Sequence, residues 1–297
     1  MDRSLTTGSG PFGTRPAGHF NKPMPEFSGL LYLEPFAPRI RGTVGDQTVV
    51  DSTSAWLLHE HGQLPVLYFP TADVRMDLLE PNGARSHSPG KGEATHYRLR
   101  MGDRIVEEAA WTFPAAEMHG LAGLIGFYFP TMQTWRQEDE PMTGHARNPY
   151  HRIDVFDTLR HVRILVHDRV IAETTRARVL YESGLPARWY LPLEDADRSL
   201  LVDSPTRTTC AYKGQARYVS VRLGDEVEAD LGWVYDEPLH DAARVAGYLC
   251  FWNERVDLEL DGESVARPVT EFVAGPPPLL GILPPEVIER LRRSRGA

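Results

Sequence analysis

One series of residues occurs twice in this 297-residue chain, and it constrains the fold more than any other feature. In each copy a Lys-Gly pair is followed by an alternating stretch, a Gly-Asp pair and a tryptophan. The lysines, Lys91 and Lys213, lie 122 positions apart (213 minus 91), and Trp111 and Trp233 keep the same interval. A shared spacing over such a length indicates an internal duplication, so we expect two domains of one architecture.

Short segments inside each copy have the composition of β-structure. Residues 40–44 and 48–51 flank a Gly-Asp pair, which is typical of a tight hairpin. Residues 97–101 alternate apolar and basic side chains, the period of a half-buried strand. They are followed by a turn at Gly102, and residues 105–110 are expected to return as the second strand of a hairpin. Residues 71–77 are expected to form a short helix capped by Thr71.

These features predict a mainly β protein with a minor α+β character. Two copies are too few for a solenoid, which needs at least three. We expect two tandem β-rich repeats, with short helices, related by a pseudo-two-fold axis. The predicted order is an extended N-terminal arm at 1–37, repeat 1 at 38–137, an interdomain segment at 138–158, repeat 2 at 159–263, and a C-terminal tail at 264–297 with a short helix at 284–293.

Composition narrows the classes of partner. The chain has 32 basic and 41 acidic residues, a net charge of −9, and no dense basic stripe, so we expect no nucleic-acid partner. No secretory signal or apolar membrane span is recognised, which favours a soluble cytoplasmic protein without a membrane partner. Two cysteines and scattered histidines indicate neither a disulfide framework nor a metal site, and no cofactor is expected. A homo-oligomer is left open.

Two stretches and the segment between the copies resemble a known family. Residues 69–81, which begin Phe-Pro and include Asp-Val-Arg-Met-Asp, and residues 206–218, which include Thr-Cys-Ala-Tyr-Lys-Gly, are similar to the DUF427 domain. The His-Ala-Arg-Asn-Pro-Tyr-His-Arg segment at 145–152 resembles the linker of its long, tandem bacterial members. The resemblance implies a β-rich domain, and the family also carries a nucleotidyltransferase label (NTP_transf_9). Repeat 1 has Ser88 and Gly90 where the family pattern has Cys and an aromatic residue, so it is open whether repeat 1 retains a working site.

The transferase label can be compared with the residues. Such an enzyme needs a Gly-Ser turn near paired carboxylates that hold Mg²⁺ on a triphosphate. Glu226, Glu228 and Asp230 have a suitable spacing, but no Gly-Ser turn accompanies them, and no P-loop is present. The sequence therefore leaves enzymatic activity uncertain.

Candidate site residues cluster around the repeated lysine. A turn lysine is often only solvated, but its recurrence beside an aromatic residue and an arginine favours an anion contact. Cys210 and Lys213 are the candidates for catalysis, although a free cysteine is commonly an inert apolar residue. Both tryptophans fit a core position better than a ligand platform. The predicted ligand-binding residues are Tyr212, Lys213, Arg217, Tyr218, Trp233, Lys91, His96, Trp111, Arg147 and His151.

The leading hypothesis is a binding protein for a small, anionic metabolite, with the pocket formed by the loop of repeat 2 and the interdomain segment. Two alternatives remain open. One is an enzyme, either a nucleotidyltransferase or a Cys- or Lys-assisted enzyme of secondary metabolism. The other is a non-catalytic scaffold whose aromatic arm binds a partner protein.

Overall fold

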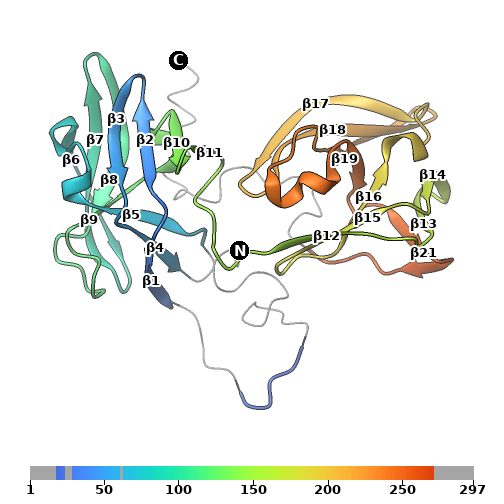
Figure 1. Ribbon diagram of the computed structural model, residues 1–297, viewed down its shortest axis with the longest axis horizontal. Helices are drawn as coiled ribbons and strands as arrows, with labels where there is room; N and C mark the ends of the chain where they lie inside the picture. The colour runs from blue at the N-terminus through green and yellow to red at the C-terminus, as the bar shows by residue number, and fades with distance from the viewer. Residues whose placement is uncertain (1–17, 24–28, 61–62, 271–297) are drawn as a thin grey trace. The chain divides into compact units, whose positions relative to one another are not determined.

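The computed structural model describes residues 18–23, 29–60 and 63–270 (Figure 1). Its described part divides into two compact units, which we call the N-terminal domain (18–148) and the C-terminal domain (149–270). Strands and short 3₁₀ turns make up the regular structure of both. None of the helical turns in the described residues is long and apolar enough to cross a membrane.

The N-terminal domain consists of two antiparallel sheets. The larger sheet has seven strands in the order β1-β4-β5-β9-β8-β7-β6, and the smaller has four in the order β11-β10-β2-β3. The strands are β1 (Leu31–Phe36), β2 (Ile40–Val44), β3 (Gln47–Ser52), β4 (Ala55–Glu60), β5 (Val66–Pro70), β6 (Leu79–Ser88), β7 (Gly92–Met101), β8 (Arg104–Thr112), β9 (Leu124–Phe127), β10 (Thr134–Gln137) and β11 (Glu140–Met142), and the 3₁₀ turns are η1 (Thr71–Asp73), η2 (Met76–Leu78) and η3 (Phe129–Thr131).

The C-terminal domain repeats this plan strand for strand. Its seven-stranded sheet has the order β12-β15-β16-β20-β19-β18-β17, and its four-stranded sheet has the order β14-β13-β21-β22. The strands are β12 (Ile153–Asp157), β13 (Val162–Val166), β14 (Arg169–Thr174), β15 (Arg178–Glu182), β16 (Arg188–Pro192), β17 (Leu201–Cys210), β18 (Gly214–Leu223), β19 (Glu226–Val234), β20 (Tyr248–Phe251), β21 (Asp257–Leu260) and β22 (Glu263–Val265), and the 3₁₀ turns are η4 (Leu193–Asp195) and η5 (His240–Val245). The prediction of two tandem β-rich repeats is confirmed.

The long hairpins follow from the turn chemistry read in the sequence. Gly102 between β7 and β8, and Gly224 between β18 and β19, have positive φ angles of 57° and 63°. This is the conformation required at the first central position of a type II′ turn, where glycine carries no steric cost. The predicted strands and hairpins at 40–51 and 97–110 are therefore observed as β2–β3 and β7–β8.

Each seven-stranded sheet buries side chains on both of its faces. In β16, Leu191 belongs to the main core of the C-terminal domain, which both sheets of that domain supply. Its neighbour Tyr190 points to the opposite face, because successive side chains of a strand alternate, and it belongs to a second cluster. That second cluster contains Trp233, Tyr235, Tyr218 and other aromatic residues, and it positions the candidate site.

The structure corrects three local predictions. Residues 71–77 form no capped α-helix: η1 and η2 are 3₁₀ turns, and η1 is preceded by Pro70 and has no side-chain cap. Between them Val74 is extended and bridges to Val50, so tertiary pairing interrupts the helical turn. The segment expected as an extended arm includes β1, which pairs with β4, and the interdomain segment includes β11 and β12, which also pair within sheets.

Other expectations concern parts of the chain that are not described. The tail helix expected near residues 284–293 and most of the arm lie outside the described residues. The pseudo-two-fold relation between the repeats stays a prediction.

Candidate functional site

The repeated lysine forms an ion pair in both domains. Lys91 contacts the carboxylate of Glu60, and Lys213 contacts that of Glu182. The two glutamates are again 122 positions apart (182 minus 60), at the ends of β4 and β15. The pair in the C-terminal domain is the more buried one, because its glutamate side chain is 6% exposed against 33% for Glu60.

Each lysine is followed by a glycine that gives its loop a backbone conformation with positive φ. Gly214 has a φ of 91° and Gly92 a φ of 94°, values that a residue with a side chain rarely adopts. A Cβ on Gly214 would also lie 3.3 Å from the backbone nitrogen of Leu239. The glycine of each Lys-Gly pair is thus a structural requirement of the tight loop that carries the lysine.

The C-terminal domain adds a histidine to the ion pair. His151 Nε2 lies 2.9 Å from Glu182 Oε1, and its ring stacks on Tyr212 with centroids 4.0 Å apart. His151 lies two residues before Ile153, which pairs with Glu182, so its counterpart in the first copy is Gly29. The Lys-Glu-His cluster, defined as Lys213, Glu182 and His151, is therefore specific to the second copy.

In the buried pair of Glu182 and Lys213, each group stabilises the ionised form of the other. Burial by itself would raise the pKa of Glu182, but the Lys213 charge and hydrogen bonds from His151 and Lys213 outweigh it and lower the pKa to about 2. Burial by itself would lower the pKa of Lys213, yet nearby Cys210 and Glu182 raise it above its ordinary value. Both groups are therefore charged at neutral pH.

The lysine has more donors than the described residues use. An ammonium group carries three N–H donors. Within the described part of the chain, Lys213 donates a hydrogen bond to one acceptor, the Glu182 carboxylate. Its side chain is only 12% exposed, so its remaining donors can be satisfied by a small ligand or by water.

The repeated tryptophans are held by tyrosines. Trp233 Nε1 donates to Tyr190 Oη at 3.2 Å, and Trp111 Nε1 donates to Tyr68 Oη at 2.9 Å. Burial raises the pKa of Tyr190, so its hydroxyl stays protonated. Trp233 is buried within the second cluster, which is the core position that the sequence favoured.

The remaining predicted site residues of repeat 2 are Cys210, Tyr218 and Arg217, and they differ in burial and in their partners. Cys210 is partly exposed and close enough to Lys213 to influence its pKa. Tyr218 is buried, and its hydroxyl lies 3.2 Å from Thr208 Oγ1. Arg217 follows the alternation of β18 to the other face and pairs with Asp236 at 2.8 Å. Arg217 is thus engaged away from the lysine.

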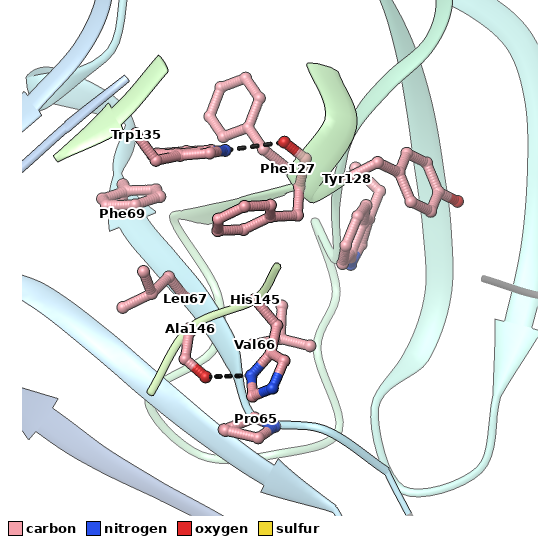
Figure 2. Close-up of a pocket in the computed structure, with 11 residues that line it drawn as sticks. Pro65, Val66, Leu67, Phe69, Phe127, Tyr128, Trp135, His145 and Ala146 are labelled. Atoms are coloured by element: carbon pink, nitrogen blue, oxygen red, sulfur yellow. Dashed lines mark hydrogen bonds between the residues drawn. The ribbon is translucent and has the colours of Figure 1, made fainter. Parts of the chain in front are cut away.

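In the N-terminal domain a small apolar hollow of about 50 Å³ lies beside β5 and β9 (Figure 2). Figure 2 shows Phe69, Phe127 and Trp135 on one side and His145 on the other. His145 Nδ1 is hydrogen-bonded to the carbonyl oxygen of Ala146 at 2.6 Å. The hollow has no Lys, Arg, Asp or Glu in its lining, so its chemistry does not fit an anion.

Comparison with protein-family models identifies the repeats. The model of a domain of unknown function, DUF427 (NTP_transf_9), matches residues 32–138 and again residues 154–262. The two matches together cover well over half of the chain. The chain belongs to the DUF427 family. A comparison with curated proteins gives no match.

Each DUF427 domain keeps its lysine, glutamate, tyrosine and tryptophan in one register. Glu182 and Tyr190 were not among the site residues predicted from the sequence. The signal that could have found them is the 122-residue interval, which relates Glu60 to Glu182 and Tyr68 to Tyr190 as it relates the lysines.

The carboxylates considered for a transferase are engaged within the C-terminal DUF427 domain. Asp230 accepts hydrogen bonds from Ser204 and Thr206, and Glu228 pairs with Arg255. Among the residues that the structure describes, no three His, Cys, Asp or Glu side chains gather as a metal-binding group. Arg147 lies in the N-terminal domain, and its part in a shared site stays a prediction.

Proposed function

We propose that the C-terminal DUF427 domain binds a small anionic metabolite, a carboxylate or a phosphate, through Lys213. The observation that carries the proposal is a buried, charged ammonium group with a single acceptor among the described residues. An anion at the remaining donors would form charge-assisted hydrogen bonds in a site that largely excludes water, where such bonds are strongest.

The difference between the two copies supports a site in the second. Around a shared Lys-Glu pair, the C-terminal domain has His151, Tyr212 and Cys210, where the N-terminal domain has Gly29, Gly90 and Ser88. The first copy forms its Lys-Glu ion pair without these side chains, so their presence in the second copy supports a role in binding a ligand. His151 bonds to the same carboxylate as Lys213, and its ring stacks on Tyr212, so both side chains lie beside the ion pair.

Binding can be tested by thermal shift and calorimetry on the full chain. The panel contains inorganic phosphate, mono- and dicarboxylic acids, acyl-CoAs, and nucleotides with and without Mg²⁺. We expect one class of anion to raise the Tm, and His151→Gln to weaken its affinity about tenfold, a loss of about 1.4 kcal/mol. Lys213→Ala should abolish the shift, whereas the matched change Lys91→Ala in the other domain should leave it intact.

The outcomes separate the three functional hypotheses. An anion that binds with equal affinity to the wild type, His151→Gln and Lys213→Ala would refute the proposed site. Stabilisation by a nucleotide only with Mg²⁺ would instead favour the transferase. No stabilisation by any anion, together with dimerisation that is lost when residues 11–28, which precede β1 in the chain, are removed, would favour the scaffold.

A further inference from the structure

A second polar cluster lies on the outer hairpin of the N-terminal domain, where β6, β7 and β8 run side by side (Figure 1). Ser86 Oγ on β6 lies 2.8 Å from His96 Nε2 on β7. The serine is exposed, whereas the histidine is only 9% exposed. A buried imidazole thus presents one nitrogen to an accessible hydroxyl group.

The other ring nitrogen faces a carboxylate. His96 Nδ1 is buried and has no hydrogen-bond acceptor among the described residues, and Glu108 Oε2 on β8 is 3.9 Å away. The Glu108 side chain is only 8% exposed. If Ser86 donates to Nε2, the neutral ring carries its proton on Nδ1, toward Glu108. The three groups therefore follow the order of a nucleophile, a general base and an orienting carboxylate.

The environment favours the neutral, basic form of the imidazole. Burial lowers the pKa of His96 below its ordinary value, and the Glu108 charge opposes this effect only in part. A neutral Nε2 can accept the serine proton at physiological pH. The adjacent carboxylate would then stabilise the imidazolium formed.

The C-terminal domain has no such chemistry at the equivalent positions. Thr208 and Tyr218 replace the serine and histidine, with their hydroxyl groups 3.2 Å apart. Burial raises the pKa of Tyr218, so its phenol is protonated and is no general base. Asp230, at the position of Glu108, is hydrogen-bonded to Ser204 and Thr206. The duplicated domain thereby supplies an internal control.

We propose that Ser86, His96 and Glu108 form a catalytic site for acyl transfer from small esters. Ser86 Oγ bonds to the acyl carbon while its proton passes to His96 Nε2. The ester C–O bond breaks, and the leaving alcohol takes the proton from His96. Water then attacks the acyl-serine, again giving its proton to His96, which returns it to Ser86 as the acid is released. Glu108 is a positioning residue in this scheme, since it acts through the imidazole.

The test uses a fluorophosphonate probe on the full chain, with intact mass and peptide mapping as readouts. We expect a single covalent adduct on Ser86 that is lost in Ser86→Ala, an exposed change that leaves the fold intact. His96→Gln should slow labelling about 100-fold or more, the usual contribution of a general base. Thr208→Ala in the other domain should label at the wild-type rate.

Hydrolysis of p-nitrophenyl acetate gives the second readout. Glu108→Gln should lower kcat about tenfold or more with little change in KM, because it affects the base and not substrate contacts. Circular dichroism and Tm confirm the fold of each variant. Absence of an adduct on Ser86 in the wild type, or labelling of folded His96→Gln at the wild-type rate, would overturn the proposal.

Discussion

Replacing Glu182 by Gln should remove a defined part of the acid sensitivity of the C-terminal domain. The change keeps the size of the side chain and imitates the protonated acid. The pKa of Glu182 is lowered from 4.5 to about 2, a difference that corresponds to roughly 3 kcal/mol of folding free energy. Because the folded-state pKa is the lower one, this stabilisation is present above pH 4.5 and is lost as the pH falls toward 2.

The measurement is urea denaturation of the wild type and of Glu182→Gln at several pH values between 7 and 3, with hydrogen exchange to separate the two domains. At pH 7 we expect the variant to be about 3 kcal/mol less stable in the C-terminal domain. The gap should shrink to a little under half near pH 3, because the carboxylate of the unfolded chain, with its ordinary pKa, is then protonated while that of the folded protein is still mostly ionised.

Glu60→Gln is the matched control. Its ion pair with Lys91 is more exposed, so the loss should be no more than about 1 kcal/mol. A gap between the wild type and Glu182→Gln that stays constant from pH 7 to pH 3 would refute the reasoning, because the lost interaction would then not depend on the ionised carboxylate.

Three further predictions concern the same domain. Burial raises the pKa of Cys250, so Ellman's reagent should modify Cys210 in the folded protein and Cys250 only after denaturation. Gly232→Ala should cost about 1–3 kcal/mol in urea denaturation, because its Cβ would lie 2.8 Å from the carbonyl oxygen of Cys250. Arg188→Met should lower the free energy of unfolding by about 3–5 kcal/mol in the same assay, because it removes the bidentate partner of the buried Glu254. Adding Glu254→Gln to this variant should restore part of the lost stability.

Local pattern was enough to predict much of the fold. The hairpins at 40–51 and 97–110 follow from alternation and from glycines that tolerate positive φ, and both depend on residues close in sequence. The predicted helix at 71–77 was wrong. Val74 pairs with Val50, which is distant in sequence, and this pairing overrides the weak helix propensity of a short segment.

The candidate site was less accessible to such reasoning. Lys213 and His151 were identified by recurrence and by composition, but their common partner Glu182 was one of 41 acidic residues. Strands β16, β20 and β19 separate β15 from β18 in the sheet. The contact between Lys213 and Glu182 therefore does not follow from the pairing of neighbouring strands. Likewise, the partner of Arg217 and the Ser86–His96 contact depend on strand register.

The sequence by itself determined that one β-rich unit occurs twice, because a duplicated series of turn glycines, lysines and tryptophans survives at a constant interval. Tertiary structure alone decided which charges meet. Ion pairs and hydrogen bonds act over a few ångströms between side chains that can be far apart in the chain, and only the folded sheets bring Lys213 to Glu182 and Ser86 to His96.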